Sequence, residues 1–387
     1  MRVLVVTSWY PEKGRPLRGV FVREQMVALH QSSKKDIEAI VFYPFDEGIQ
    51  LGELKKETEY GVLTYRANTL NTKKRYLGRL SSYLLSLRIL GKLVKEYEPD
   101  LLHVHVGYPA AIITYLFTRN HRIPYVITEH MSYLRDYVDK WQHRFLLKLA
   151  FENAAYVMPV SPYLSKQIEA FGWQTQLCPL PNVVDTSRFK PSQQVLKVQE
   201  KDETQILFVG MLDETEIKGV QYLIPAFAEV IDKQSQRRAH LHLIGDGPKR
   251  TEYEKLAIQL GISEHCTFHG QVSQEELPSY FQQIDFLVLS SLKETFGVVM
   301  IEAMACGKPI LATACGGPQS VVNDKVGMLV EPKSISSLVR GLEMMIRDHH
   351  QYDACVIREY VMENFSPEAF SKKLKNVYLK AEMEIKE

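Results

Sequence analysis

The stretch Ile284–Pro318, IDFLVLSSLKETFGVVMIEAMACGKPILATACGGP, decides the fold. It opens with the apolar run Phe286–Leu289, passes through a polar turn and a helical-looking segment, and reaches a second apolar run, Pro309–Ala312, before a glycine pair. Neither run alternates with polar residues, which is typical of strands that are buried on both faces of a parallel sheet. The stretch therefore predicts a strand–helix–strand unit of an α/β fold.

Two glutamates eight residues apart, Glu294 and Glu302, carry the chemistry of this stretch. Glu294 is expected where the first strand ends, and Glu302 lies among apolar residues of the predicted helix. A carboxylate in apolar surroundings needs hydrogen-bond donors, which sugar hydroxyls supply. The backbone amides at a helix start favour a phosphate; here they belong to Thr295, Phe296, Gly297 and Val298. The pattern fits a nucleotide-sugar, although the spacing alone is more often that of a loop charge followed by a solvated helix face.

The same residues resemble the signature of the retaining glycosyltransferases of family 4, in which Glu-x7-Glu is followed by a run like EAMACGKP and a glycine pair. The resemblance implies the GT-B fold, an α/β architecture of two Rossmann-like domains that face each other across a cleft. It also implies that Glu294 holds hydroxyls of the donor sugar and that Glu302 holds the ribose diol. The donor would be a nucleoside-diphosphate-sugar such as a UDP- or GDP-sugar, and neither a metal nor another cofactor is expected.

The first half of the chain fits this resemblance. Val3–Val6 is a predicted buried strand, and a loop that ends at Gly19 precedes a segment with helical spacing. This is how a Rossmann-type unit opens, although no G-x-G-x-x-G is present. We expect Gly19 near the donor diphosphate. The predicted domains are 1–185 (Rossmann-like, acceptor-binding), 186–203 (linker), 204–365 (Rossmann-like, nucleotide-sugar-binding) and 366–387 (a helix crossing back to the first domain).

Three histidines follow or lie on predicted strands of the first half. His130 ends a strand, where the family places a histidine near the donor sugar and the reaction centre. His103 fits a satisfied core histidine, whereas His105 lies nearer a strand end and is a candidate to face the cleft. Glu129 and Asp136 are candidates for acceptor-side groups.

The second half carries the expected donor contacts. Family members have Gly-Arg-Leu followed by Lys-Gly, and their Arg and Lys neutralise the diphosphate. Here Lys218 is present, but Met211 replaces the arginine, which leaves Arg15 or Arg18 as compensating cations. The resemblance assigns catalytic contacts to Glu294, His130 and Lys218. It also places glycines along the donor, namely Gly210, Gly245, Gly270 and Gly297.

Bulk composition narrows the choice of partners. The 387 residues carry a formal net charge of +1, which argues against nucleic-acid binding. The five cysteines are scattered, the N-terminus lacks a signal-peptide pattern, and no run approaches the ~20 apolar residues of a membrane span, so a cytoplasmic location is expected. The segment 71–96 is basic and amphipathic, which fits either a core-packed helix or a patch that docks peripherally on anionic lipid.

These observations predict a retaining, metal-independent enzyme that moves a hexose-type sugar to an acceptor hydroxyl. The acceptor would be a glycan or lipid-linked molecule of cell-envelope or exopolysaccharide synthesis. A sugar-nucleotide epimerase of the same fold is one alternative. A non-catalytic nucleotide-sugar-binding homologue, suggested by Met211, is the other.

Overall fold

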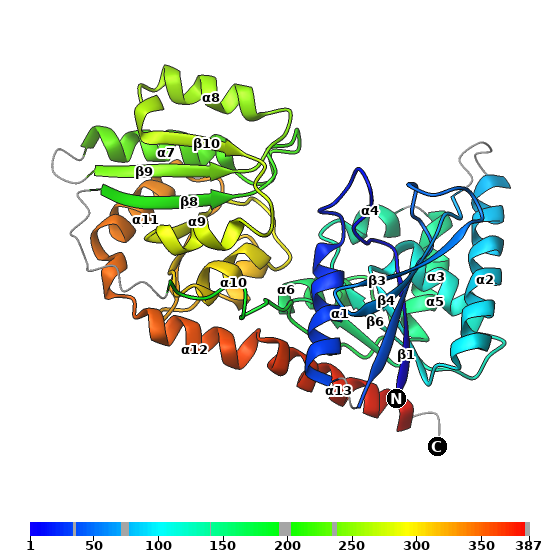
Figure 1. Ribbon diagram of the computed structural model, residues 1–387. Helices are drawn as coiled ribbons and strands as arrows, with labels where there is room; N and C mark the ends of the chain where they lie inside the picture. Colours follow the sequence, from blue (N-terminus) through cyan, green and yellow to red (C-terminus); the bar gives the residue numbers. More distant parts are fainter. Residues whose placement is uncertain (34–35, 71–76, 140, 193–202, 234–237, 384–387) are drawn as a thin grey trace. The chain divides into compact units, whose positions relative to one another are not determined.

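The computed structural model describes residues 1–33, 36–70, 77–139, 141–192, 203–233 and 238–383. The chain divides into two compact units, Met1–Val183 with Pro367–Glu387, and Val184–Ser366. Each unit is built on one sheet flanked by helices (Figure 1). Of the linker predicted over 186–203, residues 193–202 lie outside the described residues, and 186–192 belong to the second unit.

The first unit contains a seven-stranded sheet in the order β3-β4-β2-β1-β5-β6-β7. Its strands are β1 (Arg2–Thr7), β2 (Glu38–Tyr43), β3 (Leu54–Glu59), β4 (Val62–Ala67), β5 (Leu101–His105), β6 (Tyr125–Glu129) and β7 (Tyr156–Pro159). Every neighbouring pair is parallel except β3 with β4. This β3–β4 hairpin was not predicted, because β3 has the sequence LKKETE, is largely exposed and contains no apolar run.

Helices of the first unit pack on both sides of this sheet. They are α1 (Val20–Ser33), α2 (Leu77–Tyr97), α3 (Gly107–Thr118), α4 (Leu134–Val138), α5 (Trp141–Glu152), α6 (Pro162–Glu169) and α13 (Pro367–Met383). The C-terminal helix α13 runs alongside α1 (Figure 1), where Ser371 Oγ donates to the Ala28 carbonyl oxygen over 3.3 Å. The last helix is therefore part of the first unit.

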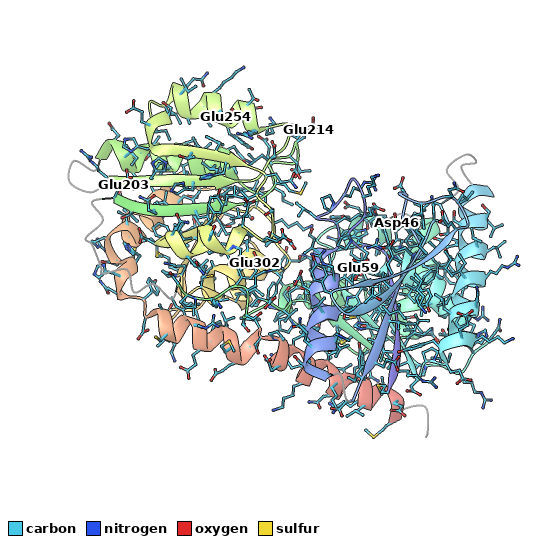
Figure 2. All side chains as sticks on the ribbon, in the orientation of Figure 1. Asp46, Glu59, Glu203, Glu214, Glu254 and Glu302 are labelled. Atoms are coloured by element: carbon cyan, nitrogen blue, oxygen red, sulfur yellow. The ribbon has the colours of Figure 1, made fainter. Side chains whose placement is uncertain are left out.

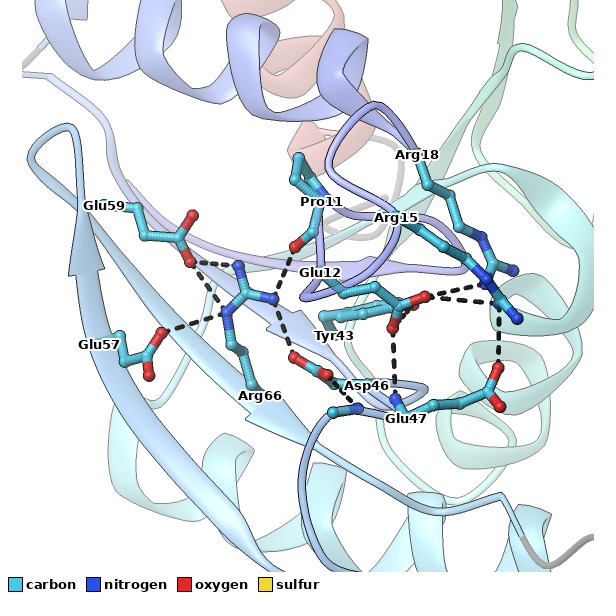
Figure 3. A network of polar contacts seen from close by, with 11 residues as sticks. Pro11, Glu12, Arg15, Arg18, Tyr43, Asp46, Glu47, Glu57, Glu59 and Arg66 are labelled. Atoms are coloured by element: carbon cyan, nitrogen blue, oxygen red, sulfur yellow. Dashed lines mark hydrogen bonds and ion pairs between the residues drawn. The ribbon is translucent and has the colours of Figure 1, made fainter. Parts of the chain in front are cut away.

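Arg66 on β4 ties the hairpin to two loops at the sheet edge (Figure 3). Its guanidinium donates to Glu59 over 2.9 Å, to Asp46 over 3.0 Å and to the Pro11 carbonyl over 2.8 Å. Only 9% of the Arg66 side chain is exposed. This network holds the loops after β1 and β2 against the polar edge strand β3.

The second unit contains a six-stranded sheet in the order β10-β9-β8-β11-β12-β13, and all its pairs are parallel. The strands are β8 (Glu203–Val209), β9 (Arg238–Ile244), β10 (Cys266–Gly270), β11 (Phe286–Leu289), β12 (Ile310–Thr313) and β13 (Gly327–Val330). The helices are α7 (Val220–Lys233), α8 (Arg250–Gln259), α9 (Leu277–Gln283), α10 (Val298–Ala305), α11 (Ile335–Asp348) and α12 (Ala354–Asn364), with short 3₁₀ turns at Ser263–His265, Gly317–Ser320 and His349–Gln351.

The strand–helix–strand prediction is confirmed. β11 and β12 pair in parallel from Leu287–Ile310 to Leu289–Ala312, and both strands are fully buried. The predicted helix between them is α10. Two parallel-sheet α/β units are thus present, and the carboxyl ends of their strands are where such sheets place ligands.

Helix α2 covers part of the basic segment 71–96, of which residues 71–76 lie outside the described residues. Its buried residues include Gly78, Ser82, Ser86, Ile89, Leu90 and Leu93. Leu80 and Leu84 instead remain 58% and 59% exposed. Part of the predicted apolar stripe therefore faces away from the core. Within the described ranges, no helix combines the length and apolar character needed to cross a bilayer.

Candidate active site

Three of the predicted donor-side glycines lie together at the carboxyl ends of β8, β9 and β10. The Gly210 N–H donates to the Ile244 carbonyl over 3.0 Å, and the Gly245 N–H donates to the Gly270 carbonyl over 2.8 Å. A Cβ atom on Gly245 would stand only 1.8 Å from the Gly210 oxygen. Since no side chain fits at this contact, glycine at position 245 lets the turn after β9 pass directly against the turn after β8.

Lys218 and Glu294 form an ion pair in the same unit. Lys218 Nζ lies 2.6 Å from Glu294 Oε2, and the two side chains are 26% and 15% exposed. Burial by itself lowers the pKa of Lys218, but neighbouring groups, first among them the charge and hydrogen bond of Glu294, raise the pKa above its usual value. The structure thus brings together a cation and an acceptor that were predicted to hold diphosphate and sugar.

Two residues after β12, Cys315 and Gly317, fix the backbone of Glu294. The Gly317 N–H donates to the Glu294 carbonyl over 2.7 Å, and the Glu294 N–H donates to the Cys315 carbonyl over 3.4 Å. A Cβ on Gly317 would lie 2.4 Å from the Phe296 nitrogen. The glycine pair of the signature therefore lets the turn after β12 pass directly against the turn after β11.

Helix α10 begins later than the sequence suggested. Its first helical residue is Val298, and Gly297 forms the N-cap with φ of 85°. Thr295 and Phe296 therefore precede the helix, and the Phe296 ring packs 5.8 Å from the ring of Phe365 and is 2% exposed. The Phe296 side chain is therefore part of the core of the second unit.

Glu302 lies on α10 (Figure 2). It belongs to the same unit as Glu294. Its side chain is half-buried. Its role toward the ribose stays a prediction.

Met211 stands where the family carries its arginine. Met211 is 58% exposed. Arg15 and Arg18 belong to the first unit, where both pair with Glu12, over 3.5 Å and 3.3 Å (Figure 3). Sequence analysis missed Arg250, whose Nη1 lies 2.7 Å from where a Gly270 Cβ would stand; no motif marks it.

In the first unit, His130 follows β6 and is 6% exposed. It stacks on Phe21 with 4.4 Å between ring centroids, and its Nε2 lies 3.3 Å from His105 Nδ1. His103 is fully buried, as expected of a core histidine, and hydrogen-bonds Tyr378 over 2.7 Å. The expectation that His105 faces a cleft is wrong, because it is completely buried and burial lowers its pKa to about 3.

Glu129 is not an acceptor-side group, since its carboxylate is fully buried and engaged by backbone. It accepts hydrogen bonds from the N–H groups of Gly107, His130 and Met131, over 2.9, 2.8 and 2.8 Å. Burial raises the pKa of Glu129 to about 7, and these three donors oppose the rise. Glu129 thus holds the chain after β5 and β6.

Asp136 is exposed on α4, and its acceptor-side role stays a prediction. Gly19 adopts φ of 68°, and a Cβ there would lie 2.5 Å from the carbonyl carbon of Trp9. The glycine is therefore required by the fold of the loop after β1. Its contact with the donor diphosphate stays a prediction as well.

Comparison with known proteins assigns both halves of the chain to related families. Residues 191–362 match the family described as glycosyl transferases group 1, and residues 19–188 match glycosyltransferase family 4. The chain is a family 4 glycosyltransferase. A putative teichuronic acid biosynthesis glycosyltransferase of Bacillus subtilis is 27% identical to it over 367 residues, 88% of each chain.

Solved structures show the same GT-B fold for this glycosyltransferase. A sucrose-phosphate synthase from Thermosynechococcus elongatus superposes with a TM-score of 0.77 at 21% identity, covering 98% of each chain. HepE of Anabaena, crystallised with UDP, gives 0.75 at 19% identity and covers 98% of this chain and 100% of its own. Among the described residues of the glycosyltransferase, no group of three or more His, Cys, Asp or Glu side chains is placed to hold a metal ion.

Proposed function

We propose that the glycosyltransferase moves a hexose-type sugar from a nucleoside-diphosphate-sugar to an acceptor hydroxyl with retention of anomeric configuration. The observation that carries the proposal is the Lys218–Glu294 ion pair, whose charged atoms lie 2.6 Å apart. Lys218 lies beside Gly210, at the carboxyl end of β8. An ammonium group suits a diphosphate, and a carboxylate suits sugar hydroxyls. The structure of Anabaena HepE with UDP supports a nucleotide-linked donor.

In the proposed reaction, the acceptor oxygen bonds to the anomeric carbon while the bond from that carbon to the phosphate oxygen breaks. Both events occur on one face of the sugar, and the acceptor proton passes to the departing phosphate oxygen. Lys218 and the amides from Thr295 to Val298 stabilise the charge that grows on the diphosphate. Gly19 would add a backbone contact to it, and His130 would contact the sugar near the reacting carbon.

Metal independence is part of the proposal, because a cation and helix-start amides would take the part that magnesium plays at other diphosphate sites. The physiological role would be the synthesis of a cell-envelope or exopolysaccharide glycan. The similarity to the B. subtilis teichuronic acid glycosyltransferase supports this role.

A donor screen tests the proposal. Nucleotide-sugars are added to the protein with EDTA present, and the melting temperature is followed. A true donor at a hundred times its Kd should add about 2.7 kcal/mol of stability, which raises the melting temperature by roughly 5–10 °C. Proton NMR of the transfer product should then show the donor's anomeric configuration. An inverted product, or dependence on added Mg²⁺, would contradict the mechanism.

A non-catalytic binding protein remains the second candidate, because Met211 is exposed where the family carries its arginine. The two candidates separate in a turnover assay over a broad panel of acceptors. Nucleotide-sugar binding without any release of nucleoside diphosphate would favour the binding protein. Release that is lost in Glu294→Ala would favour the enzyme.

We further propose that α2 docks on anionic membranes. Leu80 and Leu84 are exposed and four residues apart, and Arg88, Lys92 and Lys95 are exposed further along the helix. Each such cation near an anionic surface contributes about 1 kcal/mol. Co-sedimentation should occur with phosphatidylglycerol-containing vesicles and fall in a Leu80→Glu/Leu84→Glu variant. Equal binding to pure phosphatidylcholine vesicles would exclude this mode.

A further inference from the structure

We propose that the glycosyltransferase associates with a second copy of itself, through a groove on its second unit that binds helix α2 of the other copy. The groove lies where α11 ends and α12 begins, beside the loop that precedes β13 (Figure 1). Its volume is about 570 Å³. The inference goes beyond the proposed function and does not depend on turnover.

The apolar lining of the groove is rich in methionine. It consists of Met328, Met344, Met345, Tyr352 and Val356. Met344 and Val356 are 44% and 37% exposed, whereas Met345 is buried. Methionine is flexible and polarisable, and it is common at surfaces that bind other protein segments. A hydrophobic groove of this kind suits the apolar face of an amphipathic helix.

Carboxylates give the groove a negative charge. Asp324, Asp348 and Asp353 line it, together with Lys325. Burial raises the pKa of Tyr352, and the charges of Asp324 and Asp348 raise it further. The two carboxylates therefore act on the interior of the groove. A partner that carries cations next to its apolar side chains would match this charge.

The three carboxylates differ in how far they are already engaged. Asp348 pairs with Arg347 over 2.7 Å, and Asp353 caps α12 by accepting from the Cys355 N–H over 2.7 Å. Asp324 is exposed and has no ion-pair partner among the residues that the structure describes. Asp324 is therefore the carboxylate that is most available to a cation of the partner.

Helix α2 of the first unit has the matching surface. Leu80 and Leu84 are 58% and 59% exposed. Arg88, Lys92 and Lys95 are exposed on the turns that follow. Residues four apart lie on the same face of a helix, so two leucines and two cations form one stripe, the α2 stripe, at positions 80, 84, 88 and 92. Its apolar half and its basic half correspond to the lining and the rim of the groove.

The groove is large enough for both leucines. A cavity of about 150 Å³ holds one benzene-sized group, so a volume of about 570 Å³ has room for the two side chains. Four residues of a helix rise about 6 Å, which brings Leu80 and Leu84 close enough to enter one groove. The cations that continue the α2 stripe would then reach the carboxylates at the rim.

The contact joins different surfaces of the two copies, because α2 belongs to the first unit and the groove to the second. Such a head-to-tail contact leaves one free helix and one free groove on every pair, so association continues into rings or chains. The membrane docking proposed above uses the same α2 stripe. A helix that is bound in a groove is therefore not available to a bilayer.

Sedimentation velocity of the full chain, without lipid and over a range of concentrations, tests the inference. The average mass should rise with concentration, and added salt should weaken the association because exposed charges are screened. Two variants each remove one side of the contact: the helix variant, Leu80→Glu/Leu84→Glu, and the groove variant, Met344→Lys/Val356→Lys. Each should weaken association about tenfold or more, because the apolar contact is lost.

A mixture of the two variants gives the most specific result. The helix variant keeps its groove, and the groove variant keeps its α2. An equimolar mixture should therefore form one-to-one pairs at a concentration at which each variant alone is monomeric. A symmetric contact between two α2 helices or between two grooves cannot give this result.

Ile258→Lys is the matched control, because Ile258 on α8 of the second unit is 65% exposed and lies outside the groove. It should associate like the wild type, and the melting temperatures of all variants should agree. A monomeric wild type, wild-type association by either the helix or the groove variant alone, a mixture without pairs, or association that does not weaken with salt would each overturn the inference.

Discussion

Replacing Lys218 by Met should destabilise the second unit by about 1–3 kcal/mol. The value follows from the partial burial of the pair, whose side chains are 26% and 15% exposed. Exposed ion pairs contribute about 0–1 kcal/mol, and breaking a fully buried pair costs about 3–5 kcal/mol. Denaturant unfolding of Lys218→Met, Glu294→Gln and the double variant measures the loss and the coupling between the two side chains.

The same variants should test separately how the nucleoside diphosphate and the sugar of the donor are bound. Lys218→Met should weaken binding of the nucleoside diphosphate itself, because the cation that meets the phosphates is gone. Glu294→Gln should leave that affinity unchanged but weaken binding of the nucleotide-sugar, because only the sugar hydroxyls are lost. In turnover, Lys218→Met should lower kcat by about 10²–10³-fold, the usual effect of removing one donor to a developing charge.

Calorimetric titration of each variant with the nucleoside diphosphate and with the nucleotide-sugar is the assay. The double variant controls for the repulsion that an unpaired Glu294 carboxylate would exert on the phosphates. Wild-type affinity of Lys218→Met for the nucleoside diphosphate would refute the assignment. So would an equal loss of both ligands in Glu294→Gln.

Three further predictions address charge elsewhere in the chain. Met211→Arg, at a position 58% exposed, should tighten nucleoside-diphosphate binding about three- to thirtyfold without altering stability. Unchanged affinity in calorimetry would show that the site does not need a second cation. Arg66→Met should lower the free energy of unfolding by about 3–5 kcal/mol, because its partner Asp46 is only 6% exposed. Arg15→Ala should lower it by at most about 1 kcal/mol, because the Arg15 side chain is 55% exposed. Equal losses of stability in denaturant unfolding would contradict the role of this network (Figure 3). Burial lowers the pKa of His105 from 6.5 to about 3. The stability that comes from its neutral ring is therefore present above pH 6.5, and it is lost as the pH falls toward 3, by about 1.4 kcal/mol per pH unit. A His105→Gln variant should flatten this part of the pH–stability curve, and an unchanged slope would exclude His105 as its source.

The grouping of the predicted donor-side residues could be predicted from sequence because these residues lie at strand ends. Gly210 and Gly245 directly follow β8 and β9, Gly270 ends β10, and parallel pairing brings these strand ends to one edge. Lys218 and Glu294 are 76 residues apart, yet each is anchored to the same edge by a motif. Their contact follows from the fold itself.

The parts that sequence analysis missed depend on contacts between distant segments. Strand β3 has no apolar pattern and is held by Arg66 from β4, so neither periodicity nor composition marks it. The buried position of Glu129 depends on hydrogen bonds from three backbone amides, and no side-chain pattern in the sequence encodes where these amides lie.

Hydrogen–deuterium exchange of the full chain, with and without the nucleotide-sugar found in the donor screen, locates the donor directly. Our account predicts slower exchange at Gly210, around Lys218, at Gly245 and over Glu294–Val298, because these amides line or support the proposed donor site. Protection confined to the first unit, with these segments unchanged, would contradict it.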